Sequence, residues 1–183
     1  MTKTALIIVD MQNDYFPDGK WTLNGVEAAA ENVAKVLADF RERQQPVIHV
    51  RHEFASSDAP FFVPGTEGAN IRASLTPADG EFQVLKHEVN SFKGTKLQAL
   101  LQREQITNLV IAGAMSHICI DAITRAAGDL GYVNVVLHDA CATREAEFNG
   151  VKVPAEHVHA AFMAGLAFAY AEVITTEAFL IRA

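Results

Sequence analysis

Three residues that can do chemistry each follow a short apolar run. Asp10 ends the run TALIIVD, Lys86 ends GEFQVLK, and Cys119 follows NLVIAG after a short turn. A thiol attacks carbonyl carbon only as the thiolate, and free cysteine is mostly protonated at neutral pH. An ammonium group and a helix N-terminus favour the thiolate, while a carboxylate can carry its proton to a leaving amine. The three types together predict nucleophilic cleavage of a C–N bond.

The elements that would position these residues alternate along the chain. The apolar runs are continuous and rich in β-branched residues, as is typical of strands buried on both faces. We expect strands at 4–10, 46–51, 80–86, 108–113, 132–138 and 172–176. We expect helices at 25–44, 95–103, 119–130 and 153–170, and a short one at the C-terminus. This predicts an α/β fold over residues 1–183 as a single domain, a three-layer α-β-α arrangement with a six-stranded parallel sheet.

Such sheets bind ligands beyond the carboxyl ends of their strands, and all three residues fall at strand ends. The predicted helix at 119–130 begins at Cys119, so that the thiol would lie at a helix N-terminus. The segment 52–80 shows little periodicity and holds several prolines and glycines, which indicates a long surface excursion. We expect this excursion to help form the ligand pocket.

The composition of the chain disfavours some classes of binding partner. The 183 residues carry a formal net charge of −7, which disfavours binding to nucleic acid or to an anionic membrane. Two cysteines, Cys119 and Cys141, do not make a disulfide framework. The N-terminus is not typical of a signal peptide, and the apolar stretch at 160–170 is too short to span a bilayer. We therefore expect a cytoplasmic protein that acts on a small molecule.

With these motifs the chain resembles the isochorismatase-like cysteine hydrolase superfamily, which includes nicotinamidases, N-carbamoylsarcosine amidases and ureidoacrylate amidohydrolases. The resemblance rests on four segments in order: IIVDMQNDY, LKHEVNSFKGTKLQALL, VIAGAMSHICIDAITRAAGDLGYVNVVLHDACAT and VHAAFMAGLAFAYAEV. It implies a catalytic triad of Asp10, Lys86 and Cys119. It further implies a non-proline cis peptide between Ala114 and Met115, an oxyanion hole made of the Met115 and Cys119 backbone amides, and a homo-oligomer, either dimer or tetramer.

The motifs also distinguish between subfamilies of this superfamily. Nicotinamidases carry an Asp-x-His metal motif after the second strand, where this chain reads VIHVRHEFASSDAP and lacks it. His49 and His52, three apart on a strand, would point to opposite faces. We therefore predict no metal and no cofactor. Isochorismatases cleave a vinyl ether without a cysteine nucleophile, so Cys119 favours an amide or related C–N bond, cleaved through a thioester.

The remaining assignments concern the pocket. His117 and Cys141 are predicted not to react, and the loop aromatics Phe61 and Phe62 are predicted to lie at a subunit interface. Three alternatives stay open: a metal-assisted nicotinamidase, a true isochorismatase and a catalytically idle binding module. Five residues are predicted to bind substrate: Asn13, Phe16, His52, Asn90 and Phe92.

Overall fold

A six-stranded sheet forms the centre of the molecule. The computed structural model describes residues 3–182. The strands lie in the order β3-β2-β1-β4-β5-β8, and every neighbouring pair is parallel. Their bounds are β1 (Thr4–Val9), β2 (Val47–His52), β3 (Phe82–Lys86), β4 (Asn108–Ala114), β5 (Val133–Ala142) and β8 (Glu172–Ile174). The predicted parallel sheet is confirmed.

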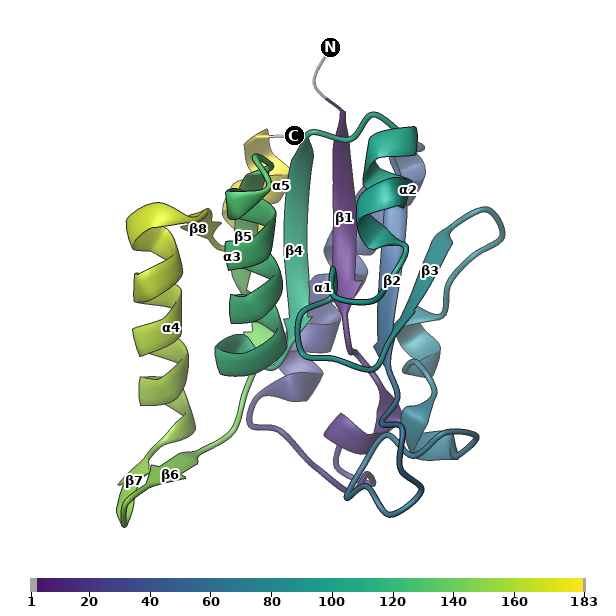
Figure 1. Ribbon diagram of the computed structural model, residues 1–183. Coiled ribbons are helices and arrows are strands. Elements are labelled where there is room, and N and C mark those ends of the chain that lie inside the picture. Colours follow the sequence, from purple (N-terminus) through teal and green to yellow (C-terminus); the bar gives the residue numbers. More distant parts are fainter. Residues whose placement is uncertain (1–2, 183) are drawn as a thin grey trace.

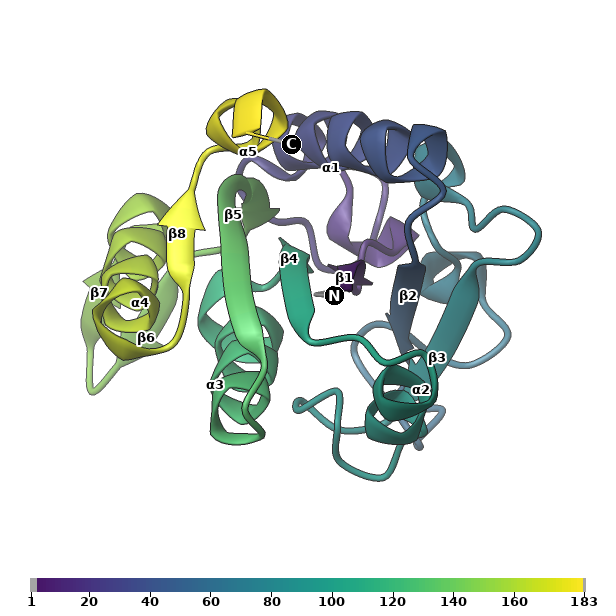
Figure 2. The ribbon, with the colours of Figure 1, turned by 90° about the horizontal axis from the view of Figure 1, so that it is seen from above.

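Helices cover both faces of this sheet, which completes the predicted three layers (Figures 1 and 2). One face carries α1 (Val26–Glu42) and α5 (Thr176–Arg182). The other carries α2 (Leu97–Arg103), α3 (Asp121–Asp129) and α4 (Ala155–Ala169). Three short 3-10 turns, η1 (Asn13–Tyr15), η2 (Glu67–Ala69) and η3 (Ala73–Leu75), lie in the loops beyond the strands.

The continuous apolar runs reflect burial on both sides. Along β1, Leu6 and Ile8 join the core beneath α1, whereas Ile7 and Val9 join the core beneath α2 and α3. Successive strand residues point to opposite faces, so a strand covered on both faces needs apolar residues at every position. This packing makes the sheet a rigid base for the residues at its ends.

The chain reverses its direction of travel across the sheet between β1 and β4. It proceeds from β1 to β2 and β3 on one side, then from β4 to β5 and β8 on the other. Gly113 pairs with Val9, and a Cβ on Gly113 would lie 2.0 Å from the Val9 carbonyl oxygen. Its φ of 128° also favours glycine. Ligands bind at such a reversal point, and Gly113 lets the two strand ends approach there.

Two local elements differ from the sequence prediction. An antiparallel hairpin, β6 (Ala146–Phe148) and β7 (Val151–Val153), precedes α4. Its strands are too short to show periodicity, although Asn149-Gly150 at the turn is a strong hairpin signal. In addition, β5 extends to Ala142, so that Cys141 lies within a strand and not after it.

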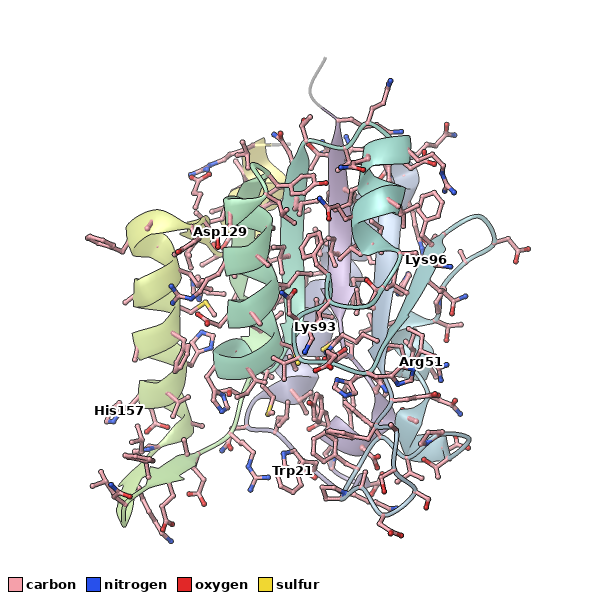
Figure 3. The ribbon with its side chains drawn as sticks, viewed as in Figure 1. Trp21, Arg51, Lys93, Lys96, Asp129 and His157 are labelled. Carbon is pink, nitrogen blue, oxygen red and sulfur yellow. The ribbon has the colours of Figure 1, made fainter. Side chains whose placement is uncertain are left out.

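The excursion after β2 folds back onto the sheet end. The Phe54 amide donates to the Phe62 carbonyl oxygen at 3.2 Å and closes a small loop. Phe61 and Phe62 are 8% and 1% exposed, and their rings pack around Tyr15 and Trp21. The predicted interface role of these two phenylalanines is wrong, because the chain itself already covers them. Trp21 lies at the same end of the molecule as the carboxyl ends of β1 and β4 (Figure 3).

Within residues 3–182, no helix has both the length and the apolar character needed to cross a membrane.

Candidate active site

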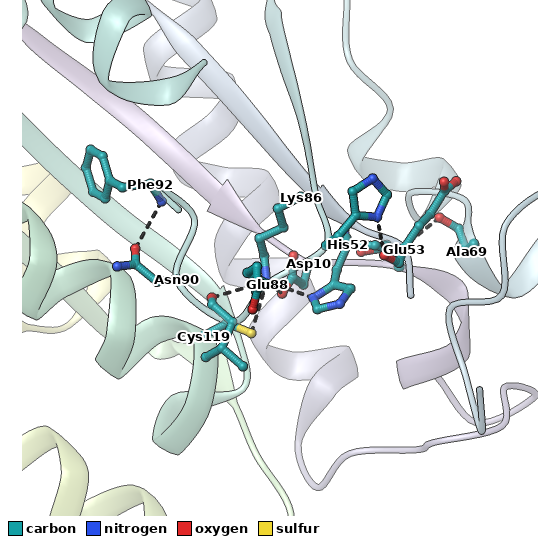
Figure 4. Close-up of polar contacts among 12 residues, drawn as sticks. Asp10, His52, Glu53, Ala69, Lys86, Glu88, Asn90, Phe92 and Cys119 are labelled. Atoms are coloured by element: carbon teal, nitrogen blue, oxygen red, sulfur yellow. Dashed lines mark hydrogen bonds and ion pairs between the residues drawn. The ribbon is translucent and has the colours of Figure 1, made fainter. Parts of the chain in front are cut away.

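Asp10, Lys86 and Cys119 meet beyond the carboxyl ends of the strands (Figure 4). The Lys86 ammonium lies 2.9 Å from Asp10 Oδ2 and donates to Cys119 Sγ at 3.2 Å. Asp10 and Lys86 are fully buried, and Cys119 is 3% exposed. The structure thus brings together the three residues that the sequence predicts, with Lys86 in contact with both of the others.

Four neighbouring strands place this cluster. Asp10 follows β1 directly, and Lys86 is the last residue of β3. His52 ends β2, between those two strands, and pairs with Lys86 in the sheet register. Cys119 follows β4 but does not begin an α-helix as predicted. It lies in a single π turn, Ser116–Ile120, that precedes α3.

Lys86 is the hub of the hydrogen bonds. Besides Asp10 and Cys119, three further acceptors lie within hydrogen-bond distance of its ammonium: His52 Nδ1 at 2.9 Å and the carbonyl oxygens of Glu88 and Val89 at 3.1 and 3.3 Å. The three N–H groups of the ammonium are therefore shared among five acceptors. Burial acts to lower the pKa of Lys86, but the Asp10 carboxylate and the Cys119 thiol outweigh it and raise that pKa. The lysine is therefore a permanent cation, held by acceptors on every strand end around it.

The charge state of Cys119 differs from the sequence prediction. Burial raises the pKa of the thiol, the nearby Asp10 carboxylate raises it further, and Lys86 only partly opposes them. The predicted lowering of this pKa by a helix N-terminus is wrong for the free protein. The raised pKa keeps the thiol protonated at neutral pH, and a carboxylate oxygen of Asp10 lies within 4.8 Å of Cys119 Sγ. Burial likewise raises the pKa of Asp10, against the influence of Lys86.

The raised pKa predicts how Cys119 reacts with iodoacetamide in the absence of substrate. At neutral pH we expect Cys119 to alkylate more slowly than free cysteine, because the thiolate is scarce. The rate should rise as the pH is increased above neutral, since the thiol then loses its proton. Peptide mapping by mass spectrometry across a pH series measures both rates. Labelling faster than free cysteine at neutral pH would instead indicate a resting thiolate.

A cis peptide bond and backbone hydrogen bonds shape the turn that holds Cys119. The peptide bond between Ala114 and Met115 is cis, as the family resemblance implies. The Met115 carbonyl oxygen accepts from the Ile118 and Ile120 amides at 3.0 and 3.2 Å, which shapes the π turn. An oxyanion hole of the Met115 and Cys119 amides stays a prediction.

Two histidines buttress this turn from outside the cluster. His117 Nδ1 lies 2.6 Å from Thr143 Oγ1, and His159 Nδ1 lies 2.8 Å from the buried hydroxyl of Ser116. These ring contacts fall on residues other than the thiol, and the expectation that His117 is not the base stays a prediction.

Of the five predicted substrate-binding residues, His52 alone has a contact with Lys86. Asn13 instead donates to the Glu67 carbonyl oxygen at 3.0 Å, and Phe16 is buried beneath the Arg72 guanidinium. Asn90 accepts from the Phe92 amide at 3.0 Å, and the Phe92 ring packs against Tyr132. For these four residues the structure shows contacts that stabilise loops, and a substrate contact stays a prediction.

Two supporting residues in the motif IIVDMQNDY escaped the sequence analysis. The Gln12 side chain donates to the carbonyl oxygens of His52 and Ala69 and accepts from the His52 amide, all at 2.7–2.8 Å. Asp14 accepts from the Phe62 amide at 2.7 Å. Both polar residues are buried. Gln12 joins the excursion to the end of β2, and Asp14 joins it to the segment that follows β1. Their short spacing from Asp10 is the signal that could have revealed them.

Among residues 3–182, the metal ligands needed for a nicotinamidase-type site are not assembled. In the described part of the chain, one group of ligand types comes close together: Asp10, His52 and Cys119. The Lys86 ammonium contacts all three, so a metal cation there would meet a fixed positive charge. His49 faces elsewhere and lies 2.8 Å from Glu81. These residues do not fit a metal ion.

The chain matches the isochorismatase domain over residues 4–178. An uncharacterized isochorismatase family protein of Bacillus subtilis strain 168 is 51% identical over 177 residues, which cover 97% of this chain and 98% of that protein. A candidate isochorismatase hydrolase from Oleispira antarctica, solved by crystallography, has a TM-score of 0.95 at 54% identity and covers 98% of this chain and 97% of that chain. The chain therefore belongs to the isochorismatase family, whose members are generally hydrolases.

A relative with a named activity is more distant. Streptothricin hydrolase of Streptomyces noursei is 32% identical over 142 residues, which cover 76% of this chain and 49% of that enzyme. This chain matches about half of the length of that relative.

Proposed function

We propose that the protein hydrolyses an amide or related C–N bond of a small molecule through a thioester on Cys119. The observation that carries the proposal is the direct contact of Lys86 with both Asp10 and Cys119 in a buried cluster. A hydrolase family, a thiol and an adjacent carboxylate together favour acyl transfer over other chemistry. The named activity of the streptothricin relative also favours hydrolysis of a small molecule.

The geometry supports a two-step mechanism. In the first step the Cys119 thiol gives its proton to Asp10, and Sγ attacks the carbonyl carbon. The Met115 and Cys119 amides would stabilise the oxyanion, and collapse expels the amine, which takes the proton from Asp10. In the second step water gives a proton to Asp10 and attacks the thioester. Cys119 leaves as thiolate and regains that proton, so acid and amine are the products.

Lys86 supports the transfer of the proton between Cys119 and Asp10 through its charge. Its fixed positive charge offsets the burial of Asp10 and stabilises the thiolate as it forms. It also stands between the two groups without exchanging its own proton, because its pKa is raised. We assign it an electrostatic role and assign the base to Asp10.

The proposal also covers the class of binding partner, the cellular compartment and the oligomeric state. A net charge of −7 fits a small-molecule partner better than nucleic acid or a membrane. A thiol nucleophile has to stay reduced, which favours the cytoplasm. A homo-oligomer, dimer or tetramer, remains our proposal from the family resemblance.

An activated ester tests the covalent step without knowledge of the substrate. We expect 4-nitrophenyl acetate to release a burst of 4-nitrophenolate and to leave one acetyl group on Cys119, mapped by mass spectrometry after acid quench. The Cys141→Ala protein should behave identically, since Cys141 lies within β5. Acetylation absent from Cys119, or equal on both cysteines, would contradict the mechanism and favour an idle binding module.

A further inference from the structure

His52 stands beside the cluster with both ring nitrogens constrained. Lys86 is a donor only, so the ring nitrogen that it contacts, Nδ1 at 2.9 Å, has to be an acceptor. Burial and the Lys86 charge lower the pKa of His52 to about 3, which keeps the ring neutral at physiological pH. A neutral imidazole with an unprotonated Nδ1 carries its proton on Nε2. The contact with Lys86 therefore selects one tautomer.

The Nε2–H group that results has no partner. His52 is 5% exposed, and its Nε2 atom is buried without a hydrogen bond to any described residue. The neighbouring rings of Phe54 and Phe62, with centroids at 4.6 and 6.1 Å, offer no oxygen or nitrogen acceptor. A buried donor without an acceptor is unfavourable, so this one points to an acceptor that arrives with a ligand.

The ring cannot easily turn to relieve this donor. Gln12 holds the His52 backbone on both its amide and its carbonyl oxygen. The contact of Nδ1 with Lys86 holds the ring itself (Figure 4). A ring nitrogen of His52 lies within 4.8 Å of Cys119 Sγ. The imidazole therefore lies close enough to the thiol to reach the acyl part of a molecule attached there.

We propose that His52 is a substrate-binding residue whose Nε2–H donates to a second acceptor in the acyl part of the substrate, a few bonds from the carbonyl carbon that Cys119 attacks. The inference rests on the proposed function and names the class of substrate. Amides that carry an acyl-side carbonyl, ether or similar acceptor are preferred over hydrocarbon analogues of the same shape. Phe54 and Phe62 supply the apolar wall around that hydrogen bond.

Two matched esters make the preference measurable. The acyl group of 4-nitrophenyl N-acetylglycinate carries an amide carbonyl, and 4-nitrophenyl 4-methylpentanoate has nearly the same shape without it. The measured quantity is the ratio of kcat/KM for the first ester to kcat/KM for the second. Comparing this ratio between wild type and variants cancels the intrinsic reactivity of the esters.

Two variants separate the two ring nitrogens. His52→Asn keeps an acceptor near the Nδ1 position for Lys86 but removes the donor at Nε2, and His52→Gln places an amide donor near Nε2. We expect His52→Asn to lower the ratio about tenfold, as loss of one buried hydrogen bond does, and His52→Gln to restore most of it. An unchanged ratio in His52→Asn would overturn the proposal.

A measurement on the wild-type protein guards against variants that fail to fold. Nitrogen-15 NMR of the histidine rings should show His52 with a protonated Nε2 and an unprotonated Nδ1. The opposite tautomer would overturn the proposal regardless of kinetics. Failure of the underlying mechanism looks different, because then neither ester would acylate Cys119 at all.

Discussion

Replacement of Cys119 by alanine should lower kcat/KM for the true substrate by about 10⁴-fold or more, because nucleophiles of this kind contribute that much in comparable hydrolases. The substitution removes the only atom in the cluster that can form the thioester. It leaves the Asp10–Lys86 ion pair in place, so the protein should stay folded. A screen of small amides, carbamoyl compounds and lactams with both proteins identifies the substrate and measures the loss.

Cys141→Ala is the matched control for that loss. Its thiol is buried within β5, and burial raises its pKa to about 12, so it has no thiolate to contribute at neutral pH. We expect its kcat/KM to stay within about twofold of wild type, as usual for residues outside the reacting groups. Full activity in Cys119→Ala would show that catalysis does not pass through a thioester.

The second large effect that we expect is a loss of stability when the buried Asp10–Lys86 ion pair is broken. Lys86→Met should lower the free energy of unfolding by about 3–5 kcal/mol, because it leaves the Asp10 carboxylate buried without its cation. Adding Asp10→Asn removes that carboxylate charge and should recover most of the stability. Activity should be lost in both proteins, since neither keeps the base and the cation together. Urea unfolding followed by circular dichroism measures the stability.

Lys93→Met provides the comparison at the surface. Lys93 is 67% exposed and pairs with Glu88 at 3.1 Å, and exposed pairs contribute only about 0–1 kcal/mol. Loss of stability in Lys86→Met equal to that in Lys93→Met would contradict a buried, uncompensated Asp10. A double variant that is no more stable than Lys86→Met alone would contradict the charge explanation.

Local sequence patterns were sufficient to predict the three layers of the fold. Runs such as TALIIVD have apolar residues at every position because both faces of β1 are covered. The helical spacing at 25–44 reflects a single buried face of α1. The hairpin β6–β7 escaped because three-residue strands carry too little periodicity. Burial of Phe61 and Phe62 escaped because it depends on Tyr15 and Trp21, which lie far away in the sequence.

By itself, then, the sequence determined the kind of fold and picked out the three residues that meet in the buried cluster, since strand runs and motif positions are local properties of the chain. Only the tertiary structure decided their electrostatics. The pKa of Cys119 depends on its burial and on Asp10, and the tautomer of His52 depends on Lys86, which reaches it from the neighbouring strand. These are interactions across strands, at distances of a few ångströms between residues that are tens of positions apart. The strength of these interactions is set by packing, which a local sequence pattern does not encode.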